Sequence, residues 1–185
     1  DQMANQSTNC FVVMGHTSNW EWAGLRAGMQ QGLHMAAVYK PQSNTKIDRF
    51  LKKTRRRFGT EMVAMSEVPR FLAKKESPWC LTFIADQNPP KETAHWVDFF
   101  GTKTAFFSGW SRLAVRMKVP VLLAVPKDSG PWNRCMDFSL IYNGTEALPP
   151  EELTARFAHA LETQIRARPE AWLWSHKRWK HVYTP

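Results

Sequence analysis

The stretch CFVVMGHTSNWEW, from Cys10 to Trp22, decides how this chain folds. Its first five residues are apolar, which is typical of a short strand buried on both faces of a sheet. Gly15 breaks the run. From Trp20 to about Gln31 the pattern predicts a helix, with Gly32 placed to end it. A buried strand, a tight turn and a helix together form the repeating unit of an α/β domain.

The same alternation continues along the chain. Further helices are predicted at 45–58, 66–75, 108–118 and 149–168. Strands are predicted at 34–39, 61–65, 79–85, 95–100, 119–125 and 134–142. These elements predict an α/β fold with a mixed, largely parallel central sheet flanked by helices. Because the sequence has neither repeats nor a low-complexity linker, we expect a single domain over residues 1–185.

Composition narrows the class of protein. Apolar residues make up 43% of the chain, which excludes a disordered protein. A net charge of +9 favours anionic partners such as nucleic acid, acidic protein or anionic lipid. No apolar stretch approaches the roughly 20 residues of a membrane-spanning helix. Because the sequence opens with Asp-Gln-Met, we expect a soluble fragment that lacks an N-terminal membrane anchor.

The cysteines and histidines suggest neither a disulfide framework nor a metal site. Cys10, Cys80 and Cys135 are odd in number and lie in or beside apolar runs, so we expect reduced, buried thiols. The histidines other than His16 are scattered without metal-ligand spacing. We therefore expect no metal and no cofactor.

His16 and Glu21 are the candidate catalytic pair. His16 follows the first strand, at the edge where α/β sheets bind ligands, and Glu21 falls in the first turn of the next helix. A carboxylate that holds one imidazole nitrogen leaves the other to accept a proton, so we expect His16 to be a general base oriented by Glu21. The structural alternative is a capping box, in which Ser18 caps the helix and Glu21 bonds back to the Ser18 backbone.

Several blocks carry a resemblance to a known family. GHTSNWEW looks like the H-x-x-x-x-D/E motif of glycerolipid and lipid A acyltransferases. The chain is most similar to the late acyltransferases of lipid A biosynthesis, in their Bacteroidetes-like form. The other matching blocks are YKPQSN (39–44), RRRFGTEMVAM (55–65), FIADQNPP (83–90), WVDFFGTKTAFFSG (96–109) and PEAWLWSHKRWKH (169–181).

The resemblance implies a glycerol-3-phosphate acyltransferase-like fold and a specific reaction. An acyl chain would pass from an acyl carrier protein or CoA thioester to a hydroxyl of a lipid A precursor, with His16 as base and Glu21 as its partner. Arg55 and Arg57, from the arginine block, and Asp86, from FIADQ, would help to bind substrate. The resemblance also implies a place at the cytoplasmic face of the inner membrane, peripheral or anchored by a preceding segment.

Two other functions stay open. The acceptor is alternatively another glycolipid or aminolipid, since the same His–Glu pair would serve. The basic helix 45–58 would alternatively bind nucleic acid, although a solvated face opposite a core face also explains it, and an anionic membrane surface suits the same charges. In the C-terminal tail we expect Trp172 and Trp174 to pack in the core. We expect Trp179 and its basic neighbours, including Arg178, to face a membrane interface.

Overall fold

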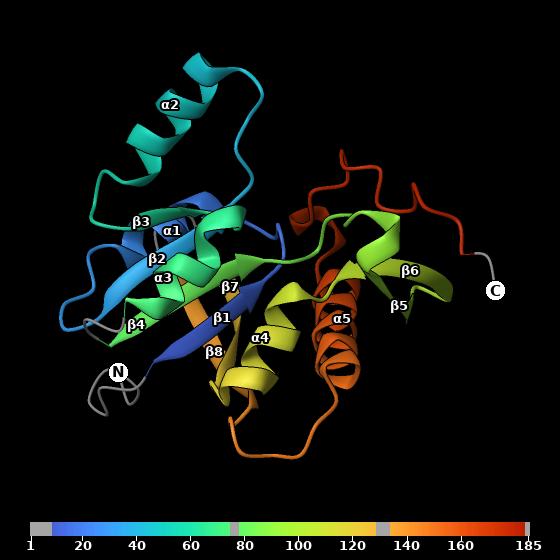
Figure 1. The fold of residues 1–185 in the computed structure, drawn as a ribbon. Coiled ribbons are helices and arrows are strands. Elements are labelled where there is room, and N and C mark those ends of the chain that lie inside the picture. The colour runs from blue at the N-terminus through green and yellow to red at the C-terminus, as the bar shows by residue number, and fades with distance from the viewer. Residues whose placement is uncertain (1–8, 75–77, 129–133, 184–185) are drawn as a thin grey trace. The chain divides into compact units, whose positions relative to one another are not determined.

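The structure is a computed structural model that describes residues 9–74, 78–128 and 134–183 (Figure 1). Six strands are hydrogen-bonded in the order β3-β2-β4-β1-β7-β8, and β5 and β6 form a separate two-stranded sheet. β2 runs parallel to both β3 and β4, whereas β7 and β8 are antiparallel. The fold is therefore the expected α/β class, with a mixed, largely parallel central sheet and flanking helices.

The chain divides into two compact units, and each is described by itself. The first unit comprises the residues up to Val12 together with Asn19–Phe83. Its core is formed by apolar side chains such as Val63, Leu72 and Leu81. Its elements are the start of β1 (Cys10–Met14), α1 (Trp20–Ala27), β2 (His34–Tyr39), α2 (Thr45–Arg55), β3 (Glu61–Ala64), a 3-10 turn (Met65–Glu67), α3 (Val68–Ala73) and most of β4 (Trp79–Ile84).

The second unit comprises Val13–Ser18 and the residues from Ile84 onward. In α5 (Pro150–Ala167) the apolar residues at helical spacing, Leu153, Phe157, Leu161 and Ile165, are all almost fully buried and form part of the core. The elements of this unit are a 3-10 turn (Lys91–Thr93), β5 (Ala94–Phe99), β6 (Thr102–Phe107), α4 (Gly109–Met117), β7 (Val121–Asp128), β8 (Arg134–Tyr142), α5 (Pro150–Ala167) and a last 3-10 turn (Pro169–Ala171).

The β5–β6 hairpin was only half predicted from the sequence. The structure pairs Phe99 with Thr102, so the connection has two residues, Phe100 and Gly101. Both have positive φ, 53° and 73°, as a tight hairpin turn of type I′ requires. Glu162 of α5 accepts a 2.8 Å hydrogen bond from the Phe100 backbone N–H, and this bond fastens the turn to the helix. Gly101, a residue typical of a tight hairpin turn, was the sequence feature that could have indicated a second strand after it.

Two further findings bear on the expectations from composition. Cys10 and Cys80 are buried free thiols as predicted, but Cys135 is exposed, because it lies on the edge strand β8. No helix among the described residues has both the length and the apolar character that crossing a bilayer requires.

Candidate functional site

His16 is held by a carboxylate far along the chain. Its Nδ1–H donates to Oδ1 of Asp86 over 2.5 Å, and its backbone N–H donates to Oδ2 of the same residue over 2.9 Å. The imidazole side chain is 13% exposed and the Asp86 side chain 3%. Both the ring and the backbone of His16 are thus fastened to one buried carboxylate.

The strand ends bring these two residues together. His16 follows β1 and Asp86 follows β4, and β1 and β4 are neighbours in the sheet. A hydrogen bond of 3.0 Å from the Ala85 backbone N–H to the Met14 carbonyl holds the ends of the two strands together, just before the turns that carry His16 and Asp86. At Gly15 a Cβ atom would lie 2.5 Å from Cδ1 of Leu161, so the Leu161 side chain would have to shift to admit any larger residue.

A tryptophan of the C-terminal segment (residues 169–183) completes the carboxylate site. Trp172, which is buried, donates its indole N–H to Oδ2 of Asp86 over 2.9 Å. Burial by itself raises the pKa of Asp86, but the hydrogen bonds and charge of His16 and the bond from Trp172 outweigh it, so the pKa of Asp86 is lowered. Asp86 therefore remains an acceptor-only carboxylate at neutral pH.

The same segment also holds the turn that carries His16. The Leu173 backbone N–H donates to the His16 carbonyl over 3.1 Å, and the Ser18 backbone N–H donates to the Ala171 carbonyl over 2.6 Å. Thr17 forms a β-bridge with Trp172. Ser18 has a φ of 48°, in the left-handed region that a residue of this type rarely adopts. The turn is therefore a constrained structure and not a loose loop.

This arrangement makes Nε2 the basic nitrogen of His16. Because Nδ1 carries the proton donated to Asp86, the neutral ring has its lone pair on Nε2. The side-chain amide nitrogen of Gln87 lies 3.5 Å from Nε2 of His16, and in this tautomer the amide is the donor of that contact. A histidine in this tautomer, backed by a carboxylate, is suited to removing a proton from a hydroxyl.

Glu21 and Arg55 form a second cluster, in the first unit. The Glu21 carboxylate accepts from Nε of Arg55 over 3.1 Å and from Nη2 over 2.5 Å. The Arg55 guanidinium also lies 5.5 Å from the centre of the Trp20 ring. The capping-box alternative is wrong, because α1 begins after Asn19 and no side chain caps it. The role of Glu21 as the partner of His16 stays a prediction, since the carboxylate found on Nδ1 belongs to Asp86.

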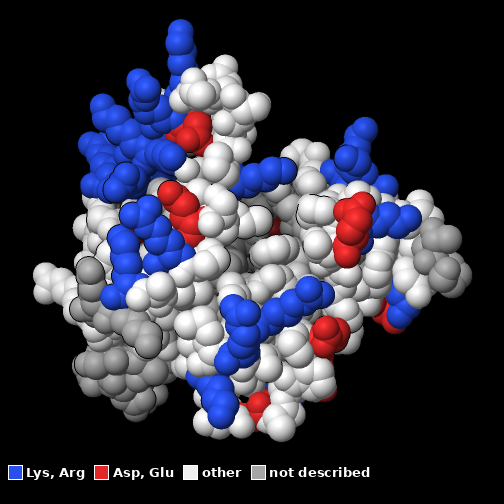
Figure 2. Space-filling view, in the orientation of Figure 1, with Lys and Arg blue, Asp and Glu red and all other residues white. Residues whose placement is uncertain are grey.

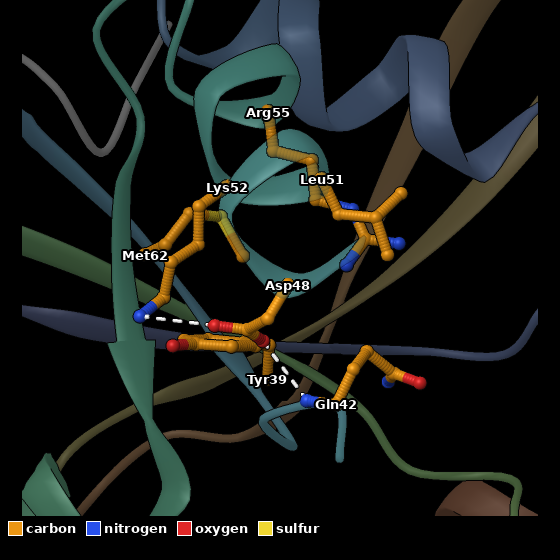
Figure 3. A pocket seen from close by; sticks show the side chains of 7 residues that line it. All are labelled: Tyr39, Gln42, Asp48, Leu51, Lys52, Arg55 and Met62. Atoms are coloured by element: carbon orange, nitrogen blue, oxygen red, sulfur yellow. Dashed lines mark hydrogen bonds and ion pairs between the residues drawn. The ribbon is translucent and has the colours of Figure 1, made fainter. Parts of the chain in front are cut away.

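Arg55 also lines a small pocket between α2 and the strands β2 and β3 (Figure 3). Asp48 is at its centre and accepts from the Gln42 backbone N–H over 2.9 Å and from Nζ of Lys52 over 3.3 Å. Lys52 lies over the Tyr39 ring. Within the block 55–57, Arg55 is the half-buried member, whereas Arg56 and Arg57 are exposed.

The sequence did not predict most of the contacts that the C-terminal segment makes. Trp172 is buried as expected, but Trp174 is 52% exposed, so its predicted core packing is wrong. Trp179 is half exposed, and its indole N–H donates to Oγ1 of Thr104 over 3.1 Å. Arg178, expected at a membrane interface, is 2% exposed and is therefore an interior residue. The alternating aromatic and basic residues were the signal, but their pattern fits surface and interior equally well.

Within the described ranges, no three His, Cys, Asp or Glu side chains gather as a metal ion would require.

Fold and site together define the class: an α/β protein with a histidine–carboxylate pair at the carboxyl ends of adjacent strands. A family profile described as bacterial lipid A biosynthesis acyltransferase matches residues 1–181, and the chain belongs to that family. The chain is 26% identical over 181 residues to a lipid A biosynthesis acyltransferase of Haemophilus influenzae. That match covers 94% of this chain and 54% of the relative, so the chain spans about half the length of this curated relative.

Proposed function

We propose that this protein is an acyltransferase that moves a fatty acyl chain from an acyl carrier protein or CoA thioester to a hydroxyl of a lipid A precursor. The observation that carries the proposal is the buried Asp86 carboxylate on Nδ1 of His16, in a chain of the lipid A acyltransferase family. It supports a general-base role for His16, with Asp86 as the residue that orients the imidazole.

The proposed reaction needs no nucleophile from the protein. Nε2 of His16 takes the proton of the acceptor hydroxyl while its oxygen attacks the thioester carbonyl carbon. The tetrahedral intermediate then collapses, so a C–O ester bond forms and the C–S bond breaks. The departing thiolate takes the proton from the His16 imidazolium and leaves as a thiol. Asp86 stabilises the positive charge that His16 carries between these two steps.

The proposed partners follow from charge. An acyl carrier protein is acidic, and a chain of net charge +9 would attract it and speed their encounter. CoA, which carries phosphates, would be attracted in the same way. Arg55, held by Glu21 and half-buried, is the member of the arginine block that we propose for an anionic substrate group. Arg57 is exposed beside Phe58, and we assign it to the surface described next.

We further propose that α2 docks on an anionic membrane surface. No residue of α2 is buried; Phe50 is 68% exposed and Ile47 51% exposed, so the idea that this helix covers a core is not supported. Figure 2 shows Lys and Arg gathered over α2. The exposed basic residues of the helix and its C-terminal turn are Lys46, Arg49, Lys53, Arg56 and Arg57. Exposed apolar side chains among basic ones are typical of interfacial binding.

Such docking would place the protein at the cytoplasmic face of the inner membrane. A lipid acceptor is available only at a membrane, whereas the thioester donors are soluble. A protein that works on both must reach the bilayer surface from the compartment that holds the donors.

The experiment that tests the function uses the full-length natural protein in membranes. His16→Ala is assayed with acyl carrier protein thioester and with CoA thioester against a lipid A precursor, with product masses measured. We expect a loss of turnover of about 10²-fold or more, which is the usual contribution of a general base. His159→Ala, which removes an exposed histidine of α5, is the matched control. Near-normal turnover by His16→Ala, or transfer only to a different glycolipid, would contradict the proposal.

A further inference from the structure

We propose that Arg178 is a positioning residue of the acyl-transfer site, an inference that rests on the function proposed above. Its buried guanidinium anchors, through Asn88, the turn that carries Asp86, so that the Asp86 carboxylate stays in place against the His16 imidazole.

Arg178 and Asp86 stand apart from the other charged residues. Among the described residues they are the charged side chains in the buried class, and each is 2% exposed. Both belong to the second unit. A buried ion without a counter-charge costs several kcal/mol, so opposite charges buried in the same unit stabilise each other. Asp86 is the acidic residue whose negative charge acts on Arg178.

The guanidinium lies against aromatic rings and is only partly hydrogen-bonded. Its Cζ is 4.2 Å from the centre of the Phe106 ring and 5.8 Å from that of Phe99, both within cation–π range. Nη1 donates to Oδ1 of Asn88 over 2.8 Å. Nε and Nη2 have no hydrogen-bond partner within the described part of the chain. Burial lowers the pKa of Arg178 to about 10, which leaves it charged at neutral pH.

Asn88 ties Arg178 to the Asp86 turn. Asn88 lies two residues after Asp86 and contacts three consecutive residues of the C-terminal segment. Its backbone N–H donates to Nε2 of His176 over 3.3 Å, its side-chain amide donates to the Lys177 carbonyl over 2.7 Å, and its oxygen accepts from Arg178. The turn is therefore held at both ends by this segment: through Trp172 at Asp86 and through residues 176–178 at Asn88.

Charged and titratable groups reach this cluster from three segments. They are His16 from the turn after β1, Asp86 from the turn after β4, and His176, Arg178 and Lys180 from the C-terminal segment. Burial lowers the pKa of His176, and the charge of Arg178 lowers it further. His176 is thus neutral at pH 7, which agrees with Nε2 accepting the Asn88 N–H. Asp86 is the anion of the cluster, and Arg178 is its buried permanent cation.

The position of the Asp86 turn decides whether its carboxylate meets the His16 ring. Asp86 accepts from Nδ1 of His16 over 2.5 Å, so a turn released from Arg178 would lengthen or break that contact. Arg178 thus acts on the proposed base through Asn88 and Asp86.

The test follows the Nδ1–H signal of His16 by NMR in the full chain. Arg178→Met removes the donor to Asn88 while its side chain can still pack against Phe106 and Phe99, and Arg178→Lys keeps a charged donor. We expect the low-field Nδ1–H signal to weaken or disappear in Arg178→Met, with kcat affected more than KM, and both to be largely retained in Arg178→Lys.

Arg116→Gln, at an exposed position on α4, is the matched control and should leave the Nδ1–H signal unchanged. Arg178→Leu is a second apolar variant should Arg178→Met fail to fold. A folded apolar variant that keeps the wild-type Nδ1–H signal, or an equal loss in the lysine variant, would overturn the proposal. The NMR measurement needs no substrate, so its outcome is separate from that of the proposed activity.

Discussion

Nδ1 of His16 and Oδ1 of Asp86 are 2.5 Å apart, although 70 residues of sequence separate them. The Trp172 indole, a further 86 residues along the chain, donates to the other oxygen of the same carboxylate. The site is thus a three-residue chain, indole to carboxylate to imidazole. Each member comes from a different segment, so each can be tested on its own.

Asp86→Asn should impair His16 without changing the shape of the site. An amide cannot stabilise the imidazolium and does not hold Nδ1 as the donor, so we expect turnover to fall by about 10²-fold or more. The measurement is kcat/KM for acyl transfer. The imidazole Nδ1–H signal expected at low field in the wild-type NMR spectrum should disappear together with the activity.

Glu21→Gln is the matched control, because Glu21 is the acid that the sequence placed beside His16. In the structure its carboxylate accepts from Arg55, so this variant should keep the Nδ1–H signal of His16. Loss of that signal in Glu21→Gln and its retention in Asp86→Asn would reverse the assignment.

Trp172→Phe should weaken the protein in a pH-dependent way. The pKa of Asp86 is lowered in the folded state, so its contribution to stability is present above the unfolded-state pKa and is lost as pH falls through the folded-state value. Without the indole donor the pKa of Asp86 is lowered less, so Asp86 contributes less to the stability of the folded state. We expect unfolding to be easier by roughly 1–3 kcal/mol at pH 7, with a smaller difference in acid.

The measurement is denaturant unfolding at several pH values. Trp174→Phe removes an exposed indole that donates to the Pro169 carbonyl over 2.7 Å, and it serves as the comparison. A Trp172→Phe deficit that is the same at pH 3 and pH 7 would argue that lost packing, and not the hydrogen bond to Asp86, is the cause.

Charge reversal on α2 should release the protein from anionic vesicles. Lys46, Arg49 and Lys53 are exposed on the helix, and each basic residue near an anionic surface contributes about 1 kcal/mol. The triple change to Glu should therefore lower binding by about 10²-fold or more, and Phe50→Ser should lower it less. Co-sedimentation with phosphatidylglycerol vesicles measures this.

The comparison variant reverses Arg112, Arg116 and Lys118, which lie on α4 and its C-cap in the second unit. Single-stranded oligonucleotides are assayed in parallel. Tight oligonucleotide binding without vesicle binding would point to a nucleic-acid surface and against membrane docking.

Arg178→Met should destabilise the folded state. The variant removes the bond to Asn88 and leaves the buried Asp86 carboxylate without its buried cation, and breaking a buried pair of charges costs about 3–5 kcal/mol. The folded-state pKa of Arg178, about 10, lies below that of an unfolded arginine, so loss of the desolvation cost of Arg178 offsets part of this effect. We expect a net loss of about 1–3 kcal/mol in denaturant unfolding at pH 7. A variant at least as stable as the wild type would contradict the anchoring role.

Most elements and the position of His16 were predictable because their signals are local. The apolar run 10–14 is a strand and the stripe from Leu153 to Ile165 lies on one buried helix face, as their spacing indicates. His16 follows the first strand, as its place in the sequence indicates. The β6 strand was missed because its polar start resembles a loop. The prediction that Cys135 is buried was wrong because an edge strand exposes a residue that an inner strand would bury.

The sequence alone determined the α/β alternation, the family and the position of His16 at a strand end, since periodicity and motif spacing are carried by neighbouring residues. Only the tertiary structure decided that Asp86 holds the imidazole, that Trp172 holds Asp86 and that Arg178 lies in the interior. Those contacts depend on strand order and on the path of the C-terminal segment, which bring together residues that are distant along the chain and have no pattern in common.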